Sequence, residues 1–401
     1  MENNVFGNYL VVIVGAGPSG IATSALLNSM SIPNIVFERD DCCASLWKKR
    51  SYDRLCLHLA KNFCSLPMMP HSFRTATFMS KDKFADYVDK YVTRFNVNPR
   101  YCHNVESALY EEANQKWKIE VKNTEVTDGV GSLQVYYADF LVIATGENSR
   151  PVTPELPGIE TFKGNVMHAQ DYKCGASFRD QNVLVVGCGN SGMEISNDLA
   201  ESGAHASIVV RSQVILQVHV MSRELVRLGM VLLDYLPMNI VDRFILYLAK
   251  FSYGDLPSYG ISPPVEGPFF FKALTGKTPV IDRGTVKKIR SGKIKVFSGV
   301  ETIRHNIVEF KNGSIQRVDA IVMATGYRSV AHKWLKDYKV ILDENDKPKN
   351  KYPGHCKGEK GVYCVGFSGK GIPGISFDSR AVANDIHQIL LVKTGNAARE
   401  V

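Results

Sequence analysis

Two short glycine-rich stretches with the same spacing suggest where chemistry is done in this chain. The stretch VVIVGAGPSG ends at Gly20 and the stretch VLVVGCGNSG ends at Gly192, and each carries three glycines in the spacing G-x-G-x-x-G. In such a turn the first glycine makes the tight bend, the second lets the backbone approach a pyrophosphate, and the third lets a helix pack on a strand. The candidate phosphate-binding residues are Gly15, Gly17, Pro18, Ser19 and Gly20 in the first copy and Gly187, Gly189, Asn190, Ser191 and Gly192 in the second.

Each glycine turn is flanked by the pattern of a strand–helix–strand unit. The first copy predicts a strand over 9–14, a helix over 21–30 and a strand over 34–37, and the second predicts a strand over 182–186, a helix ending near 202 and a strand over 206–210. Each copy also leads to a buried strand that ends in A-T-G, at Thr145-Gly146 and at Thr325-Gly326. A small residue and a turn at that strand end suit a position beside a bound cofactor. The pattern therefore predicts two dinucleotide-binding units.

The residue that closes the second strand of such a unit meets the adenosine ribose and so discriminates between dinucleotides. Glu38 follows the first copy at this point, and a carboxylate accepts hydrogen bonds from a free ribose, as in FAD or NAD. Arg211 follows the second copy, and a guanidinium pairs with the 2′-phosphate of NADPH, with the Ser212 hydroxyl as a further donor. A solvated arginine at a strand end is the alternative. We predict FAD in the first unit and NADPH in the second, with Thr145 and Gly146 beside FAD and Thr325 and Gly326 beside NADPH.

A chain that binds both dinucleotides is expected to pass hydride from NADPH to FAD. None of the nine cysteines forms a C-x-x-C pair, which disfavours dithiol reductases, a zinc site and a disulfide framework, and indicates reduced cytosolic thiols. We expect no metal. Oxygen or a quinone-like small molecule then remains as the electron acceptor.

Composition indicates a folded protein with a mild preference for anionic ligands. Hydrophobic residues make up 45% of the chain, and the net charge of +8 is scattered without the basic run that marks a nucleic-acid arm. The N-terminal apolar run predicts a strand and no export signal. Residues 230–251 are apolar but contain charges and a proline, which indicates a pair of amphipathic helices and no transmembrane segment. Interfacial contact with a membrane is the alternative for this segment.

We predict an α/β fold with two Rossmann-like dinucleotide-binding domains, the NADPH domain inserted in the FAD domain. The expected domains are residues 1–170 for the first part of the FAD domain, 171–330 for the NADPH domain and 331–401 for a return segment of the FAD domain. In that return segment we expect a strand over 362–366 and a final helix that Asp378 opens and caps. A helix N-terminus there favours a reduced, anionic flavin, so Asp378 is also a candidate FAD contact.

Four stretches link the chain to a known family. Residues 162–172 follow the pattern F-x-G-x-x-x-H-x-x-x-Y, which resembles the fingerprint of flavin-containing (class B) monooxygenases. Three further stretches resemble the plant YUCCA branch of that family. They are ASLWKKRSYDRLCLHLAKNFCSLPMMP (44–70), FMSKDKFADYVDKYVTRFNVNPRY (78–101) and LVIATGENSRPVTPELPG (141–158). The resemblance runs through essentially the whole chain.

The resemblance implies an FAD- and NADPH-dependent enzyme that converts indole-3-pyruvate to indole-3-acetic acid, the plant hormone auxin. In the family's chemistry NADPH reduces the flavin, oxygen adds to give a C4a-(hydro)peroxyflavin, and attack on the 2-oxo acid releases carbon dioxide. The partners are thus a small 2-oxo acid and O2, and the expected location is cytoplasmic, with association at the endoplasmic-reticulum surface as an option. N- or S-oxygenation of another small molecule, and a weakly active nucleotide-binding flavoprotein, are the alternatives.

The resemblance also carries over individual residues. Leu46 and Trp47 join the first glycine turn and Glu38 as candidate FAD contacts, although Trp47 could equally be a core aromatic. His58, where related enzymes often have asparagine, and His168, in the fingerprint, are the candidate catalytic residues, with satisfied packing histidines as the alternative. The loop after Arg211 looks longer than is typical of the branch, which bears on how the NADPH phosphate fits.

Overall fold

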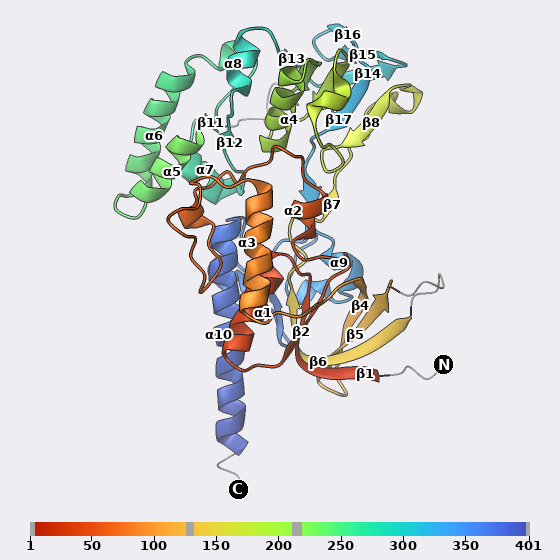
Figure 1. Ribbon diagram of the computed structural model, residues 1–401, viewed down its shortest axis with the longest axis vertical. Coiled ribbons are helices and arrows are strands. Elements are labelled where there is room, and N and C mark those ends of the chain that lie inside the picture. The colour runs from red at the N-terminus through yellow and green to blue at the C-terminus, as the bar shows by residue number, and fades with distance from the viewer. Residues whose placement is uncertain (1–4, 126–131, 211–218, 398–401) are drawn as a thin grey trace. The chain divides into compact units, whose positions relative to one another are not determined.

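The computed structural model describes residues 5–125, 132–210 and 219–397, and it divides into two compact units (Figure 1). Unit 1 comprises residues 1–49, 61–150 and 327–401, and unit 2 comprises 50–60 and 151–326. The boundaries expected near residues 170 and 330 therefore fall at 150 and 326. The first lies earlier because β8 (Asn165–His168) pairs in parallel with β17 (Ala320–Met323) of unit 2. The short segment 50–60, which the sequence assigned to the first domain, also belongs to unit 2, and we call it the arm.

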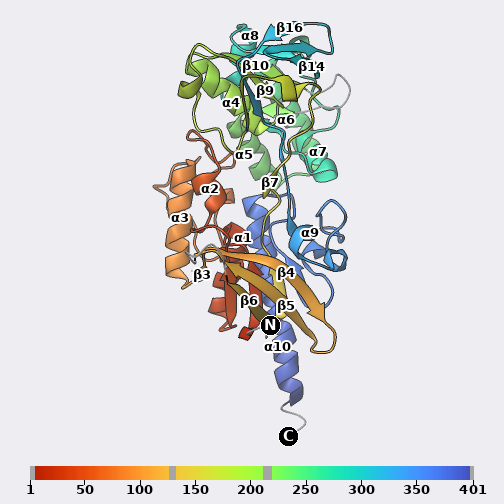
Figure 2. The same cartoon turned by 90° about the vertical axis from the view of Figure 1, so that its right-hand side faces the viewer.

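Unit 1 is built on a sheet whose parallel strands run in the order β3-β2-β1-β6, with β19 paired in parallel to β6. The amino-terminal part of β6 also pairs antiparallel with β5, which pairs with β4, so these three strands form a meander (Figure 2). Residues 11–13 of β1 and 141–143 of β6 are fully buried, as expected for central parallel strands covered on both faces. The elements of unit 1 are β1 (Val5–Val14), α1 (Pro18–Ser29), β2 (Asn34–Phe37), α2 (Ser45–Lys49), α3 (Lys81–Arg94), β3 (Pro99–Arg100), β4 (His103–Glu111), β5 (Lys116–Asn123), β6 (Leu133–Ile143), α9 (Ala331–Trp334), β19 (Val362–Cys364) and α10 (Ile372–Ala397).

Unit 2 has a parallel sheet in the order β13-β10-β9-β17-β8, together with a separate antiparallel meander β14-β15-β16. Its elements are β8, β9 (Asn182–Val186), α4 (Asn190–Glu201), β10 (His205–Val209), β11 (Val220–Met221), α5 (Arg223–Leu232), α6 (Met238–Tyr253), α7 (Pro268–Thr275), β12 (Val280–Ile281), α8 (Thr285–Arg290), β13 (Lys295–Phe297), β14 (Val300–Arg304), β15 (Ile307–Phe310), β16 (Ile315–Arg317) and β17. Two further strands, β7 (Arg150–Pro151) and β18 (Tyr327–Arg328), pair where the chain passes between units.

The two sheets repeat the same plan beyond the glycine turns that first indicated it. In strand order, β3-β2-β1-β6-β19 of unit 1 corresponds to β13-β10-β9-β17-β8 of unit 2. Unit 1 adds β5 and β4, which form a meander with β6, and unit 2 adds the separate meander β14-β15-β16. The fold class predicted from the sequence is confirmed: both units are doubly wound α/β structures, and unit 2 interrupts unit 1 along the chain.

Backbone hydrogen bonds show which residues of the two copies are equivalent, and this equivalence differs from the one we expected. The amide of Gly15 donates to the carbonyl of Phe37 at 2.8 Å, and the amide of Gly187 donates to that of Val209 at 3.2 Å. Residue 38 is therefore equivalent to residue 210, and Glu38 corresponds to Val210 rather than to Arg211. The spacing from the first glycine to the strand end is the same in both copies, so Arg211, which follows Val210 in the sequence, corresponds to Arg39.

Two helices differ from the sequence expectation in position. The last helix, α10, begins at Ile372, so Asp378 lies in its second turn and does not cap it. The apolar segment 230–251 is divided between α5 and α6, because Pro237 precedes the first residue of α6 and no residue of 233–237 is helical. Within the described ranges, no helix has the length and apolar composition that would let it cross a membrane.

A matched pair of glycine substitutions tests the close approach in the first turn. We expect Gly20→Ala to lower the free energy of unfolding by about 1–3 kcal/mol, because the added Cβ would lie 1.9 Å from the Gly15 carbonyl oxygen. When the proteins are compared without bound ligand, Gly17→Ala should change it by less than about 1 kcal/mol, because the added Cβ meets no atom within 4 Å. Urea unfolding of both variants measures this, and an equal loss in the two would contradict the assignment.

Candidate dinucleotide-binding sites

The first glycine turn brings three backbone segments closer than a side chain would permit. Gly15 has a φ of +108°, and a Cβ there would lie 2.6 Å from the carbonyl oxygen of Ala144. A Cβ on Gly20 would lie 1.9 Å from the Gly15 carbonyl oxygen. Gly15 and Gly20 are therefore required by packing of β1, α1 and the end of β6, whatever binds nearby.

The middle glycine of this turn is different, because the space beside it is open. Gly17 is the N-cap of α1, with Pro18 at the first helical position, and no side chain caps the helix. The first-turn amides of a helix point outward and, with the helix dipole, attract anions. A Cβ on Gly17 would meet no protein atom within 4 Å. This is the geometry of a cradle for a phosphate group.

The second turn reproduces this geometry. Gly187 has a φ of +114°, with a hypothetical Cβ 2.4 Å from the Ala324 carbonyl oxygen, and a Cβ on Gly192 would lie 1.9 Å from the Gly187 carbonyl oxygen. Gly189 is the N-cap of α4, again with no side-chain cap and no atom within 4 Å of a hypothetical Cβ. The chain therefore carries two cradles of one design.

Side chains near the two turns are less alike than the backbones. Both polar atoms of the Asn190 side chain are engaged by backbone groups. Its Nδ2 donates to the Pro279 carbonyl at 3.2 Å, and its Oδ1 accepts from the Ile281 amide at 2.7 Å, which holds β12 beside α4. Ser19 is buried and Ser191 is half-buried. Asn190 thus supports the second turn through its neighbours.

The carboxylate of Glu38 is built into the first turn. It accepts from the amide of Ala16 at 2.7 Å and from the amide of Asp40 at 3.0 Å. Burial raises the pKa of this carboxyl above its usual value, and the two amide hydrogen bonds oppose that rise. With one lone pair on each oxygen engaged, the carboxylate retains acceptor capacity for a ribose hydroxyl.

The A-T-G strand ends lie directly against the turns in both units. The Ala144 amide donates to the Val14 carbonyl, and the Ala324 amide donates to the Val186 carbonyl, each at 2.9 Å. The two threonines differ, because the hydroxyl of Thr325 donates to the Val152 carbonyl, whereas the buried hydroxyl of Thr145 finds no hydrogen-bond partner among the described residues. An orphaned buried hydroxyl beside the first cradle fits a polar ligand there. The following glycines, Gly146 and Gly326, have φ values of +77° and +87° and open space around them.

Leu46 and Trp47 lie on the short helix α2 of unit 1. The ring of Trp47 packs edge-on against Phe84 of α3 with ring centroids 4.8 Å apart, and Leu46 is partly exposed. The structure therefore gives Trp47 a packing role within unit 1. It places Leu46 at the surface of the same helix.

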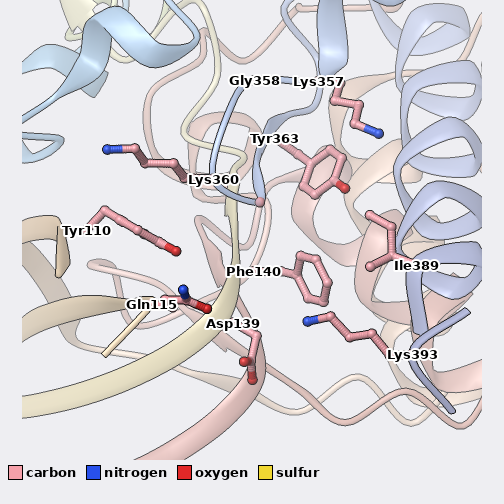
Figure 3. A pocket seen from close by; sticks show the side chains of 11 residues that line it. Tyr110, Gln115, Asp139, Phe140, Lys357, Gly358, Lys360, Tyr363, Ile389 and Lys393 are labelled. Carbon is pink, nitrogen blue, oxygen red and sulfur yellow. The ribbon is translucent and has the colours of Figure 1, made fainter. Parts of the chain in front are cut away.

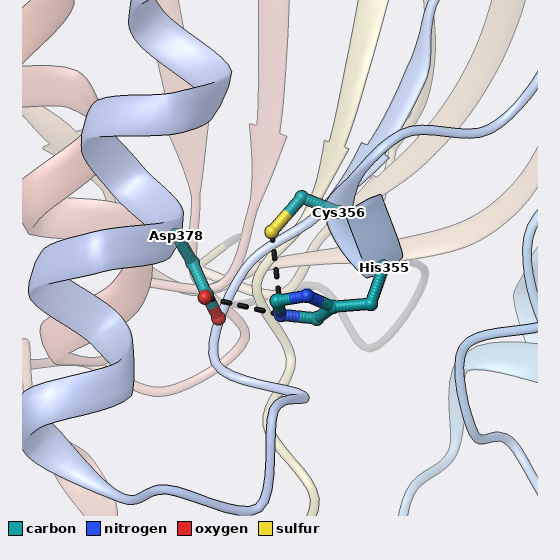
Figure 4. Close-up of side chains that lie close together, drawn as sticks. All are labelled: His355, Cys356 and Asp378. Carbon is teal, nitrogen blue, oxygen red and sulfur yellow. Dashed lines mark hydrogen bonds and ion pairs between the residues drawn. The ribbon is translucent and has the colours of Figure 1, made fainter. Parts of the chain in front are cut away.

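Asp378 has a structural environment that the sequence did not reveal (Figure 4). The side chain is fully buried, and its two oxygens are engaged separately: Oδ2 accepts from the Gly366 amide at 2.9 Å, and Oδ1 contacts Nε2 of His355 at 3.1 Å. A Cβ on Gly366 would lie 2.2 Å from the Ser19 hydroxyl, so Gly366 lies against the first turn. Asp378 therefore holds a glycine that touches the cradle, and the capping role predicted for it is wrong.

The same cluster contains Cys356, whose Sγ lies 3.4 Å from Nε2 of His355. One ligand atom from each of the three residues falls within 4.8 Å of the others, which is a spacing that a metal ion could use. However, burial and the charge of Asp378 raise the pKa of the Cys356 thiol far above its usual range, and metals bind the thiolate. We interpret the cluster as a hydrogen-bonded support for the Gly366 turn.

His58 lies on the arm and belongs to unit 2. Its Nε2 contacts Oε1 of the buried Glu194 at 2.8 Å, and the hydroxyl of Tyr52 donates to Oε2 of the same carboxylate at 2.7 Å. Arg283 approaches Glu194 at 3.6 Å, and Arg54 of the arm pairs with Asp198 at 3.0 Å. The arm is therefore fastened to α4, the helix that begins at the second cradle. Sequence inspection missed Glu194 because a carboxylate inside an amphipathic helix gives no sign of its partners.

The fingerprint 162–172 gains a structural explanation. A Cβ on Gly164 would lie 2.2 Å from the Asp319 carbonyl oxygen, and the buried Tyr172 hydroxyl donates to Asp198 at 2.7 Å. His168 ends β8 and is buried, its Nδ1 accepts from the Gln170 amide at 3.2 Å, and burial lowers its pKa below the usual value. A hydrogen bond of the imidazole to the backbone of Gly326 acts against that shift, so His168 lies beside the second A-T-G strand end.

A separate hollow of about 310 Å³ lies in unit 1 at the amino end of β19 (Figure 3). Gly361 and Phe140 line it together with Tyr110, Lys360 and Lys393. The first cradle lies at the carboxyl ends of the same parallel strands, where β1 leads into Gly15 and β19 leads into Gly366. The hollow therefore does not belong to the dinucleotide site.

Arg211 and Ser212, and the long loop that follows them, lie outside the described residues. The predicted contact with the 2′-phosphate stays a prediction.

The chain is similar to known proteins over nearly its full length. A family profile described as flavin-binding monooxygenase-like matches residues 9–370. The probable indole-3-pyruvate monooxygenase YUCCA10 of Arabidopsis thaliana is 51% identical over 388 residues, which cover 96% of this chain and 99% of that protein. The indole-3-pyruvate monooxygenase YUCCA6 of the same plant is 43% identical, with 94% and 90% covered. The chain belongs to the YUCCA family of flavin-binding monooxygenases.

Solved structures support the fold of this YUCCA family member. A flavin-containing monooxygenase from Stenotrophomonas maltophilia matches with a TM-score of 0.70 at 16% identity, covering 96% of this chain and all of that one. Cyclohexanone monooxygenase from Rhodococcus sp. Phi1 bound to NADP+ matches with a TM-score of 0.69 at 17% identity, covering 95% and 84%. At these identities the likeness concerns the fold.

Removing the carboxylate at the centre of the arm's contacts should loosen the arm. We expect Glu194→Ala to lower the free energy of unfolding by about 2–3 kcal/mol, because the buried Tyr52 hydroxyl loses its acceptor and His58 loses its partner. Glu301→Ala, at an exposed site of the same unit, should cost less than about 0.5 kcal/mol. Urea unfolding measures the difference. Limited proteolysis should show faster cleavage within 50–60 in Glu194→Ala only, and unchanged cleavage would refute the role of this carboxylate.

The lowered pKa of His168 predicts a pH dependence with a definite sign. A histidine whose folded pKa lies below its unfolded value of about 6.5 favours the fold in its neutral form. That contribution is fully present above pH of about 6.5 and is lost as the pH falls below it. We expect His168→Gln to show a flatter decline of urea midpoint than the wild type between about pH 6.5 and pH 5. Because burial also lowers the pKa of His71 and His219, part of the decline should remain. Identical slopes would contradict the assignment.

Proposed function

We propose that this chain is an FAD- and NADPH-dependent monooxygenase that converts indole-3-pyruvate to indole-3-acetate. The observation that carries the proposal is the pair of cradles in one chain, each with a middle glycine that opens onto free space at a helix N-terminus. Two dinucleotide sites on one chain suit hydride transfer from a nicotinamide to a flavin. The substrate is taken from the names of the YUCCA relatives.

The residues of unit 1 fit FAD. We assign the pyrophosphate to Gly17, Pro18 and the first turn of α1, and the ribose hydroxyls to the spare acceptor capacity of Glu38. The unpartnered Thr145 hydroxyl offers one further polar contact, with Gly146 next to it. Asp378 acts through Gly366 as a positioning residue, and Leu46 and Trp47 are assigned to the border of the site. When bound, the flavin supplies the capacity to accept hydride and to activate oxygen, which no amino-acid side chain provides.

The residues of unit 2 are assigned to NADPH. Gly189, Ser191 and the first turn of α4 receive its pyrophosphate, and Thr325 and Gly326 lie at the strand end beside it. Arg211, with Ser212, is assigned to the 2′-phosphate, because a guanidinium pairs with phosphate in two parallel hydrogen bonds. His168 lies next to Gly326, and its neutral imidazole can donate or accept a hydrogen bond without adding charge. His58 acts through Glu194 as a positioning residue that holds the arm.

The overall reaction balances without a protein nucleophile. Indole-3-pyruvate, O2, NADPH and one proton give indole-3-acetate, carbon dioxide, NADP+ and water. One oxygen atom enters the product carboxylate and the other leaves as water, and the bond between the oxo carbon and the original carboxylate breaks. The task of the chain's own residues is therefore to bind, orient and exclude water.

We further propose a cytoplasmic location. Nine cysteines, all free in the structure, suit a reducing compartment. Attachment to the surface of an internal membrane is the finer alternative, and it depends on the outer face of α6 described below.

The two cradles can be tested separately. We expect Gly17→Ala to purify without FAD because its Cβ fills the space for the pyrophosphate, while Gly189→Ala retains the yellow flavin but is no longer bleached by NADPH. Arg211→Ala should lose at least about tenfold of the preference for NADPH over NADH, since a charge-assisted pair is removed. Arg39→Ala is the matched control, because it occupies the equivalent place in unit 1, and it should keep the preference.

Product analysis then decides the reaction. The wild type should consume NADPH and form indole-3-acetate from indole-3-pyruvate in equal amounts, with phenylpyruvate as the comparison acid. Oxygenation of an amine or thioether in place of the oxo acid would replace the proposed function. A colourless protein that binds no flavin would overturn it altogether.

A further inference from the structure

Helix α6 in unit 2 is apolar on both of its faces. Its inner face is formed by Val241 and Ile245, which are fully buried in a small core with α5 and β12. Its outer face consists of residues spaced by three and four along the helix, which places them on one side. These outer residues are Ile240, Arg243, Phe244, Tyr247, Lys250 and Phe251.

The apolar members of the outer face are exposed to an unusual degree. Phe251 is 86% exposed, Tyr247 70%, Ile240 49% and Phe244 46%. Further exposed apolar side chains lie on adjoining segments: Tyr235 and Leu236 precede α6, and Phe270 and Leu274 lie on α7. Several exposed apolar side chains on one side of a helix mark a site of association. Figure 1 shows α5, α6 and α7 grouped together in unit 2.

The charges on this face all have one sign. Arg243 and Lys250 are exposed, and neither forms an ion pair with any residue that the structure describes. The acidic residue of the helix, Asp242, points inward, where its carboxylate accepts from the amides of Phe269 at 2.9 Å and Phe270 at 3.0 Å. The outer face therefore presents aromatic and aliphatic side chains with two unpaired cations and no carboxylate.

We propose that the outer face of α6 lies on the surface of an anionic lipid bilayer. A helix parallel to the membrane plane buries its apolar side chains at the boundary of headgroups and acyl chains, while lysine and arginine reach the lipid phosphates. The helix has 16 residues and is thus about 24 Å long. Aromatic side chains are favoured at that depth.

A second copy of the chain fits this face less well. A symmetric dimer brings the same patch of both subunits together. On α6 that pairing would set the cations of one helix against those of the other, with no carboxylate on the face to compensate. A bilayer with anionic headgroups has the complementary charge.

The inference is independent of the proposed enzymatic function and is tested by sedimentation with vesicles. The full-length, FAD-loaded protein should bind vesicles of phosphatidylcholine with phosphatidylserine, and bind pure phosphatidylcholine more weakly. The double variant Tyr247→Glu/Phe251→Glu should lower binding to both by about tenfold or more. Arg243→Gln/Lys250→Gln should lower binding to the anionic vesicles by about thirtyfold and leave binding to neutral ones nearly unchanged.

Phe73→Glu is the matched control, because Phe73 is 85% exposed in unit 1, and this variant should bind as the wild type does. The FAD content and turnover of every variant should equal those of the wild type. If a glutamate variant fails to fold, Tyr247→Ala/Phe251→Ala replaces it. Absence of wild-type binding, binding unaffected by Tyr247→Glu/Phe251→Glu, or a wild-type dimer that this variant dissociates would each overturn the proposal.

Discussion

In each unit the carbonyl oxygen of the first glycine occupies the place where the third glycine would carry a Cβ. The approach of 1.9 Å in both copies means that any side chain at Gly20 or Gly192 would displace backbone. This single contact sets how close each helix comes to the strand before it. It also aims the uncapped N-termini of α1 and α4 at the open space beside Gly17 and Gly189, so the position of a bound phosphate depends on it.

On this shared backbone the side chains have diverged. The buried hydroxyl of Thr145 has no hydrogen-bond partner among the described residues, whereas the hydroxyl of Thr325 donates to the Val152 carbonyl. Glu38 stabilises the first turn through the Ala16 amide, and its equivalent in the second unit is Val210, which offers no acceptor. Two copies with the same skeleton but different polar groups suit one chain that must hold two different dinucleotides.

The sequence was informative where chemistry and backbone constraint coincide. The glycine turns, the strands 34–37 and 182–186 and the A-T-G strand ends were predictable because each follows from local sterics and an apolar run. The mismatch between Glu38 and Arg211 was not, since the two strand ends can be equated only once the Gly15 amide is seen to bond to Phe37 and the Gly187 amide to Val209. The start of α10 was predicted too late. The helix begins at Ile372, but the stretch from Ile372 contains a proline and a glycine, which are typical of a turn.

The site residues also differ in whether the sequence alone could identify them. Residues that act through backbone geometry could be located from spacing alone, whereas Glu194, His355 and Gly366 required the tertiary structure, because their partners are distant in the chain. The predicted roles of His58 and Trp47 depended on resemblance. In the structure both side chains have clear packing or hydrogen-bonding partners within their own units.

The arm gives the chain a connectivity that a simple insertion would lack. A simple insertion is joined to its host at two points, but here the backbone passes between the units at four, near residues 49, 60, 150 and 326. The arm enters unit 2 immediately after α2, so the helix that carries Leu46 and Trp47 is covalently continuous with the partners of Glu194. Neither unit is a contiguous piece of gene. Neither unit could therefore be exchanged as one continuous fragment, because each would have to be cut from the chain at more than one place.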